Sequence, residues 1–304
     1  MRMTVAASPH IRGDFRTNRI MLDVILALLP AWLVGVWRFG IRALIVTLIC
    51  IAFSLAAEYL YCVFTKSRNT VIDCSSMVTG MLLAMTLPAS VPYWQAAVGS
   101  VFAIIVAKML CGGLGQNVFN PALLARAFML LIYPVGVTRY MTGGVHHMVM
   151  PSLPQESVLD MFLGNCPGSI GEISALALLI GGAYLIYRKV ISIRIPAAYL
   201  GTVAVLTLIF SKTGEPFLWM LYSLFSGGLM LGAIFMATDY TTSPVTAKGQ
   251  LLFGVGCGVL TVVFRYFGLF PEGVTYAILI MNGFVWVIDR HTAPRRFGVQ
   301  GGKK

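Results

Sequence analysis

The chain has 304 residues, of which 58% are hydrophobic and only 11% are charged. Its mean hydropathy of +0.84 excludes an ordinary soluble domain, in which about half of the residues are apolar and about a quarter are charged. A net charge of +11 would suit nucleic-acid binding in a soluble protein. Here the basic residues lie between apolar runs instead of along one exposed strip with aromatic residues, so no nucleic acid is expected as a partner.

Apolar runs that can cross a membrane follow one another along most of the chain. A span needs about 20 apolar residues, or fewer where the helix is broken and packed inside protein. The ten segments that meet this criterion are residues 20–36, 42–64, 76–87, 94–110, 121–137, 174–187, 196–210, 217–236, 251–266 and 275–288. The predicted fold class is therefore an all-α integral membrane protein with about ten transmembrane helices.

The basic residues between these runs predict the orientation, because Lys and Arg collect in cytoplasmic loops. One side receives most of them, namely Arg2, Arg12, Arg16, Arg19, Lys66, Arg68, Arg188, Lys189, Arg194, Lys248, Arg290, Arg295, Arg296, Lys303 and Lys304. The other side receives essentially Arg38, Arg42, Arg139 and Lys212. Both termini are thus expected in the cytoplasm, and the first apolar run is expected to act as an uncleaved insertion signal.

The spans repeat in two halves. Residues 21–51 and 174–206 share an apolar run, a short basic turn and a second apolar run. Residues 78–126 and 227–282 share a short span opened by Gly, a loop, a longer span, a Gly-rich turn and a final helix, although apolar helices can also resemble each other by chance. Each unit holds an odd number of spans, so the second copy is inverted, with the interrupted third and eighth spans near the membrane midplane.

This repeat predicts the division of the chain. The expected parts are a cytoplasmic segment 1–19, a five-helix repeat 20–137, an extracytoplasmic loop 138–171, a second five-helix repeat 172–288 and a basic cytoplasmic tail 289–304.

Charged residues within the spans, among them Asp23, Glu58, Arg126 and Arg265, need an explanation, because charge is costly in hydrocarbon. Glu58 and Arg265 lie near the ends of their spans and are expected to snorkel or to cap a helix. Asp23 and Arg126 lie deeper in apolar runs, where ion pairing or the lining of a pocket is expected at least as much as simple solvation. The six cysteines form no C-x-x-C pair and are expected to be buried thiols.

The densest polar sequence at membrane level is GGLGQNVFNPALLARAF, residues 112–128. Glycines allow a close backbone approach, and Asn117 and Asn120 supply amide groups before a helix that begins at Pro121. Such a turn can hold a planar, hydrogen-bonding or anionic ligand, or it can be a capped re-entrant turn without a ligand. His146 and His147 have no third ligand nearby, so no metal site is predicted.

The chain contains no Walker-type phosphate loop, no H-E-x-x-H and no G-x-S-x-G, so no catalytic residue for hydrolysis or ATP use is predicted. Six stretches resemble the RnfD family of the Rnf complexes: SPHIR (8–12), IMLDVILALLPA (20–31), VTGMLLAMTLP (78–88), residues 112–128, LDMFLGNCPGSIGEISALALLIGGAYLI (159–186) and YAILIMN (276–282). The Rnf complex is the ion-translocating ferredoxin:NAD oxidoreductase, and RnfD is related to NqrB of the sodium-pumping NADH:quinone oxidoreductase.

The resemblance implies a subunit of a redox-driven ion pump in a bacterial or archaeal cytoplasmic (inner) membrane. Its partners would be the other Rnf-type subunits (A, B, C, E and G) and membrane lipid, and its coupling ion Na+ or H+. In the family, FMN is usually esterified to a threonine of a [ST]-[GST]-A-T motif in the loop between the fifth and sixth spans. This loop lacks the motif and keeps only Thr138 and Thr142, so Thr142 is a candidate without the expected context and covalent FMN is not predicted.

The resemblance also implies a second, non-covalent flavin site, for riboflavin or FMN. The matching positions are Thr79, Asn117 and Asn120, and Asp23 is expected nearby, so these four residues are predicted to line a cytoplasm-side flavin or ion pocket. Two other functions stay open: a flavin-free channel or carrier, which also uses inverted repeats with broken helices, and a structural scaffold within the complex.

Overall fold

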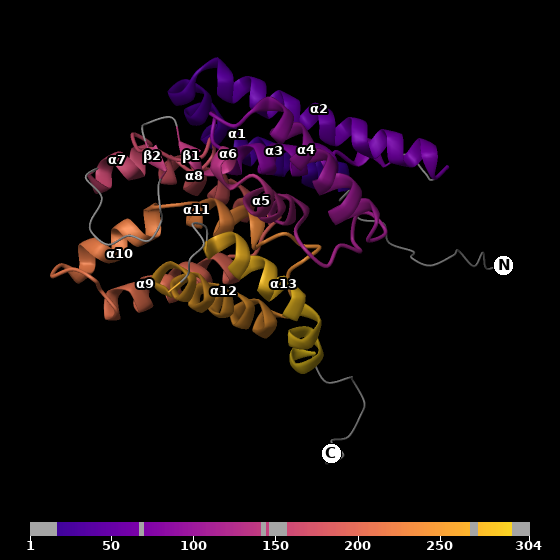
Figure 1. The fold of residues 1–304 in the computed structure, drawn as a ribbon. Coiled ribbons are helices and arrows are strands. Elements are labelled where there is room, and N and C mark those ends of the chain that lie inside the picture. Colours follow the sequence, from indigo (N-terminus) through magenta and orange to yellow (C-terminus); the bar gives the residue numbers. More distant parts are fainter. Residues whose placement is uncertain (1–16, 67–69, 141–143, 146–156, 268–272, 294–304) are drawn as a thin grey trace, which may run out of the picture.

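The structure is a computed structural model that describes residues 17–66, 70–140, 144–145, 157–267 and 273–293, and all structural statements concern these residues. They form helices almost throughout (Figure 1). The elements up to the end of the first half are α1 (Thr17–Phe39), α2 (Ile41–Phe64), the 3-10 helix η1 (Val71–Asp73), α3 (Ser75–Thr86), α4 (Tyr93–Ile104), the π-helix η2 (Ile105–Met109), α5 (Pro121–Ile132) and α6 (Pro134–Thr138).

Two strands of two residues each, β1 (Arg139–Tyr140) and β2 (Gly144–Val145), pair antiparallel in the connecting loop. The elements that follow are α7 (Val158–Leu163), α8 (Ala175–Tyr187), α9 (Arg194–Ile209), α10 (Pro216–Phe225), α11 (Leu229–Leu231), the π-helix η3 (Gly232–Met236), α12 (Ala247–Phe267) and α13 (Gly273–Thr292).

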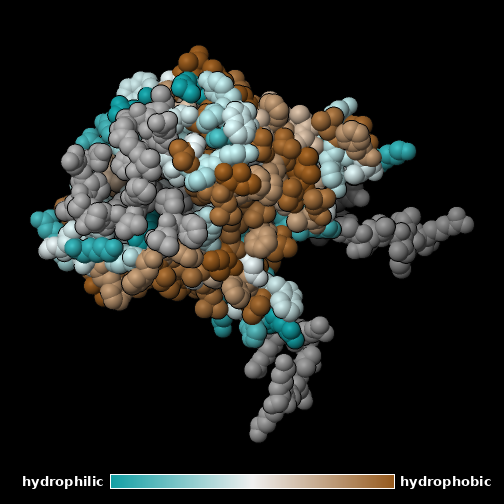
Figure 2. Space-filling model, viewed as in Figure 1, coloured by the Kyte–Doolittle hydropathy of each residue, from teal (hydrophilic) through white to brown (hydrophobic). Residues whose placement is uncertain are grey.

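Three described helices, α1, α2 and α12, are long and apolar enough to cross a membrane by themselves. A fourth crossing is possible where α10 and the α11–η3 segment follow each other at a bend of 65°. Several shorter apolar helices lie between them, and Figure 2 shows a broad hydrophobic surface with hydrophilic residues toward its margins. The chain is therefore a multi-pass, all-helical membrane protein, as its composition predicts.

Two pairs of helices from the two halves pack closely against each other (Figure 1). Helix α1 contacts α8, and α5 contacts α13, whereas α2 contacts α3 and α4, and α9 contacts α10 and α12. The α1–α8 contact depends on Gly181, because a Cβ atom there would lie 2.0 Å from the carbonyl oxygen of Ala27. A residue without a side chain thus lets the two helices approach closely at the centre of the molecule.

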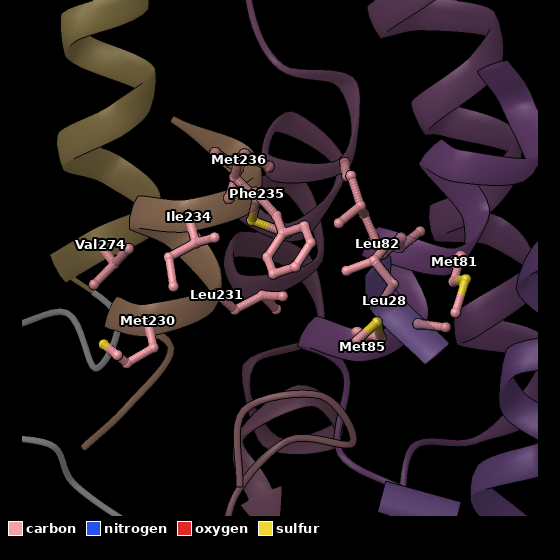
Figure 3. Packing of buried hydrophobic residues seen from close by; sticks show 14 of the residues in the cluster. Leu28, Met81, Leu82, Met85, Met230, Leu231, Ile234, Phe235, Met236 and Val274 are labelled. Atoms are coloured by element: carbon pink, nitrogen blue, oxygen red, sulfur yellow. The ribbon is translucent and has the colours of Figure 1, made fainter. Parts of the chain in front are cut away.

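Two short helices meet in the middle of the core. Figure 3 shows Phe235 of η3 pointing toward Leu82 of α3, with Leu28 of α1 beside Leu82. All three side chains belong to one buried apolar cluster that joins both halves of the chain. The expected third span, 76–87, is thus a buried half-length helix, and its neighbour from the second half is the short segment that follows the break in the eighth.

The end of α3 is stabilised by the end of the long connecting loop. The N–H groups of Gly171 and Ile170 donate to the carbonyl oxygens of Met85 (2.8 Å) and Leu87 (3.0 Å). A helix that ends inside a membrane leaves carbonyl groups that water cannot reach, so each needs a partner from the protein. The loop supplies partners for two of these carbonyl groups.

The break between α10 and α11 is stabilised by Arg265 of α12. Its Nη1 donates to the carbonyl of Ser223 (2.5 Å), and its Nη2 donates to those of Ser226 (2.9 Å) and Gly227 (3.1 Å). Gly227 and Gly228 have φ angles of +54° and +60°, which glycine adopts without steric cost. Arg265 therefore caps a broken helix, which confirms the interpretation of this residue as a cap.

Candidate cofactor pocket

A pocket opens between the first and second halves, beside the ends of the short helices. The atom-free space in and around it, open solvent included, is about 710 Å³. The residues that line it are Met21, Val24, Ser75, Val78, Thr79, Leu82, Lys108, Leu114, Asn117, Asn120, Pro121, Ala122, Leu185, Val190, Ile191, Phe235, Thr238, Asp239, Tyr240 and Thr241. Three of the four predicted pocket residues, Thr79, Asn117 and Asn120, are among them.

Asn117 lines this pocket and carries a buried hydrogen-bond acceptor without a partner among the described residues. Its side chain is 6% exposed, and its Oδ1 has no hydrogen-bond partner among the described residues. A buried carbonyl oxygen without a donor costs about 1–3 kcal/mol. Because Asn117 lines the pocket, a ligand that presents an N–H or O–H group would remove this cost.

Asn120 has a different role, because its side chain is occupied by the protein. Its Oδ1 accepts from the N–H groups of Ala122 (3.1 Å) and Leu123 (3.4 Å), and its Nδ2 donates to the carbonyl of Met236 (3.2 Å). It thereby caps α5 and binds the end of η3. With the amide of Asn282 oriented to suit its neighbours, Asn282 accepts from the Asn120 N–H at 3.2 Å. Asn120 therefore positions the turn and joins it to the second half.

Thr79 lies on α3 and is 8% exposed. Its hydroxyl donates to the carbonyl of Ser75 (3.0 Å), one turn earlier. The oxygen of that hydroxyl keeps its capacity to accept, so Thr79 can still receive a hydrogen bond from a ligand.

Lys108 of η2 is a pocket residue that the sequence reasoning missed. Its side chain is 1% exposed, and its Nζ lies 2.7 Å from Glu58 Oε1 and donates to Ser75 Oγ at 2.7 Å. Glu58 itself is fully buried and also accepts from Thr70 Oγ1 at 2.6 Å. The expectation that Glu58 snorkels or caps a helix was wrong. A lysine inside the expected span 94–110, with one acidic residue in a neighbouring span, was the signal for this pair.

Asp23 does not line the pocket. Its carboxylate accepts from the hydroxyl of Tyr184 (2.9 Å) and from the guanidinium of Arg188 (3.2 and 3.3 Å), both near the end of α8. Its neighbours Met21 and Val24 do line the pocket, so Asp23 lies on the same helix but faces another way. Of the alternatives for this residue, the structure shows an ion pair, with Arg188. Arg126 is fully buried on α5, as its place in the sequence predicts.

Asp239, in the loop after η3, is the acidic residue that lines the pocket. Its Oδ1 accepts from the N–H of Thr241 (3.3 Å), and its Oδ2 accepts from the hydroxyls of Thr241 (2.9 Å) and Thr242 (3.4 Å). Burial raises the pKa of Asp239, and these hydrogen bonds oppose part of that rise. Lys108 and Asp239 thus give the pocket one basic and one acidic side chain.

Both π-helices border the pocket, since Lys108 belongs to η2 and Phe235 to η3. π-helical segments are rare in proteins. Those that occur are often found at functional sites, because the wider turn redirects side chains. Nothing in the local sequence predicted them.

Some predicted residues lie outside the described part of the chain. These are Thr142, considered for covalent FMN, and His146 and His147, for which no metal was expected. Among the residues that the structure describes, no group of three or more His, Cys, Asp and Glu side chains could hold a metal ion.

Comparison with known proteins gives the relatives of the chain. The family model described as the NQR2, RnfD, RnfE family matches residues 4–298. The D subunit of the Na(+)-translocating ferredoxin:NAD(+) oxidoreductase complex of Acetobacterium woodii is 46% identical, with 100% of this chain and 98% of the relative covered. The D subunit of the proton-translocating ferredoxin:NAD(+) oxidoreductase complex of Clostridium ljungdahlii is 40% identical, with coverages of 98% and 96%.

The D subunit of the ion-translocating oxidoreductase complex of Stutzerimonas stutzeri is 37% identical, and 92% of each chain is covered. The match extends over nearly the whole chain and confirms the resemblance found in the six sequence stretches. The chain belongs to the NQR2, RnfD, RnfE family.

Proposed function

We propose that the chain is a membrane subunit of an Rnf-type ion-translocating ferredoxin:NAD oxidoreductase and that it binds a flavin non-covalently in the pocket around Asn117. In that complex it takes part in electron transfer coupled to export of Na+ or H+, together with the other Rnf-type subunits. The names of its relatives support the complex, and they include both a Na+-translocating and a proton-translocating example. The single observation that supports the ligand is the unpartnered Oδ1 of Asn117.

The residues of the pocket fit a flavin. Asn117 Oδ1 can accept from the ring imide N–H, and the hydroxyl of Thr79 and the ammonium of Lys108 can face polar ring atoms. Leu82 and Phe235 supply apolar surface for the flat ring system. When bound, a flavin supplies the capacity to accept and release electrons. The chain would orient it through Asn117 and keep water from it through the apolar wall.

We also propose that residues 20–137 and 172–288 form two inverted five-helix repeats with ten crossings and cytoplasmic termini. Two observations support this. The order of packing is similar, since α4 contacts α2 and α5 in the first half, and α12 contacts α9 and α13 in the second. Lys108 and Arg265 also occupy equivalent places, each near the end of a long helical segment and close to the start of a short one, at Ser75 and at Gly227.

For the connecting loop we propose that no flavin is bound through a phosphoester. The support is the missing threonine motif between residues 138 and 171. Flavin fluorescence that stays with the denatured chain in a gel would contradict this proposal.

The substitution Asn117→Leu tests the ligand in the assembled complex. Leucine has a similar volume and no polar atom, so in a turn without ligand it should be neutral or stabilising. If a flavin is bound there, the variant complex should lose that flavin while it still assembles. Ser54→Ala is the matched control, because Ser54 Oγ is also buried and unpartnered among the described residues but lies outside the pocket. Equal flavin content in Asn117→Leu, Ser54→Ala and the unmodified complex would overturn the proposal.

A further inference from the structure

Lys108 is held in an arrangement that leaves part of its bonding capacity for the pocket. An ammonium group has three donors, and the structure uses two of them, toward Glu58 Oε1 and Ser75 Oγ. The side chain is 1% exposed, yet it lines the pocket. A charge in such surroundings is screened little by water, so its effect on a ligand at short range is large.

The start of α3 adds positive potential at the same place. This helix has 12 residues and begins at Ser75, and its N-cap residue, Cys74, makes no side-chain capping bond. Free N–H groups at a helix N-terminus favour negative charge nearby. Ser75, Val78 and Thr79 from the first turns of α3 all line the pocket. Lys108 donates to Ser75 Oγ at this helix start. The charge of Lys108 and the N-terminus of α3 therefore both favour a negative charge in this part of the pocket.

The ligand that suits these groups must meet two requirements. It must present a donor to Asn117 Oδ1, and it must be able to carry negative charge near Lys108. A flavin meets both once it is reduced, because uptake of two electrons and one proton leaves the ring as an anion that keeps its imide N–H. The electrons would come from an iron–sulfur or flavin donor of the complex.

We propose that Lys108, held in place by Glu58, stabilises the anionic reduced state of the ligand in the pocket relative to the oxidised state. This inference rests on the proposed function. It assigns to Lys108 the setting of the reduction potential, whereas Asn117 governs binding in both states. Glu58 acts through Lys108 and is a positioning residue.

Asp239 gives the inference an internal control of opposite sign. Its carboxylate lines the same pocket, so its charge should disfavour an anionic ligand. Lys108 lines the pocket and Glu58 does not, so removal of the Lys108–Glu58 pair takes away mainly positive potential at the ligand. Removal of this pair and removal of the Asp239 charge must therefore shift the ratio of affinities for the reduced and oxidised ligand in opposite directions. If these side chains acted only through packing, the two variants would not be expected to shift the ratio of affinities in opposite directions.

The experiment measures the midpoint potential of the non-covalent flavin in the assembled complex by spectroscopic redox titration. The variants are Asp239→Asn and the double variant Glu58→Gln with Lys108→Met, which removes both charges of the buried pair together. We expect the double variant to weaken binding of the reduced flavin relative to the oxidised flavin by at least about tenfold, so its potential falls. Asp239→Asn should raise the potential, and Lys108→Arg, which keeps the charge, should leave it near that of the unmodified complex.

Four outcomes overturn the inference. Bound flavin with an unchanged potential in the double variant contradicts the role of Lys108 and leaves the proposed function intact. A shift of the same sign in Asp239→Asn and the double variant contradicts the electrostatic cause. If the double variant does not assemble, Asp239→Asn and Lys108→Arg decide the question, and a lower potential in Asp239→Asn refutes it. Absence of non-covalent flavin from the unmodified complex overturns this inference and the proposed function together.

Discussion

Glu58 of α2 and Lys108 of η2 form a buried ion pair, with 2.7 Å between Oε1 and Nζ and side-chain exposures of 0% and 1%. The pair joins the second helix to the wall of the candidate pocket, where Lys108 also binds Ser75 at the start of α3. Buried pairs contribute little net stability compared with well-packed apolar residues, but loss of one partner leaves a charge without compensation. The test is therefore to compare the stability after removal of one charge of the pair with the stability after removal of both.

Glu58→Gln should destabilise the protein by about 3–5 kcal/mol, because it leaves the Lys108 ammonium buried without a counter-charge. Unfolding of the purified protein in detergent, followed by circular dichroism at increasing denaturant, measures this change. The double variant with Lys108→Met is the control, since it removes both charges, and it should recover most of the loss. Equal stability of the single variant and the unmodified protein would show that the pair is not charged in the folded state.

Arg265→Met should destabilise the segment between α10 and α11 where the helix is broken. It removes the donors to three carbonyl groups, those of Ser223, Ser226 and Gly227, and a buried carbonyl left without a partner costs about 1–3 kcal/mol. Arg265→Lys should recover only part of this, because an ammonium cannot reproduce the planar fork of the guanidinium. Proteolysis at residues 226–228 reports on the break. If the lysine variant matches arginine in protease resistance, the fork geometry does not matter.

Asn120→Ala and Asn120→Ser separate the two roles of Asn120. Serine is a good N-cap but lacks the Nδ2 group that donates to Met236, so it should keep the cap and lose the contact with η3. The alanine variant should be less stable than the serine variant by about 1 kcal/mol, the usual worth of an N-cap. Thermal unfolding in detergent compares the two. Identical melting temperatures would mean that the cap contributes nothing to α5.

Helix α7, in the loop between the two halves, should lose stability in acid. Hydrogen bonds from Ser157 and Asn165 lower the pKa of Asp160, so the folded state binds this proton less readily than the unfolded chain. The stabilisation is complete above the ordinary pKa of an aspartate, near about 4, and disappears as the pH falls through the lowered value. Ser157→Ala should raise the Asp160 pKa and move the loss to higher pH. Hydrogen exchange of α7 at acidic pH measures this loss of stability. Equal exchange in Ser157→Ala and in the unmodified protein would refute the prediction.

The sequence predicted the membrane class, the two half-length segments and three of the pocket residues, because these depend on local composition. Thr79, Asn117 and Asn120 come together because each lies at the beginning of a short helix or in the polar turn before it. Packing of the two halves, which brings Phe235 and Asp239 to the same pocket, depends on contacts far apart in sequence. Apolar periodicity does not encode such contacts, so these residues were not predicted.

The prediction for Glu58 was wrong, and no role was predicted for Lys108. Their position near the ends of apolar runs suggested contact with water for Glu58, whereas the fold places the two groups face to face in the interior. A charge near the end of a span can contact water or form a buried ion pair. The outcome depends on whether an opposite charge faces it from a neighbouring helix. The lysine in the expected span 94–110 was a candidate partner, but sequence spacing cannot show that the two groups face each other, since Glu58 and Lys108 are separated along the chain by another helix, α3.

The most direct test of the account is a count of flavin in the intact complex by mass spectrometry, with covalent and released flavin measured separately for this chain. Parallel preparations of the unmodified complex and of Asn117→Leu are compared at equal subunit content. We predict one released flavin that is lost in Asn117→Leu, and no flavin covalently attached to this chain. An unmodified complex without released flavin, or an Asn117→Leu complex that keeps all of it, would contradict the account.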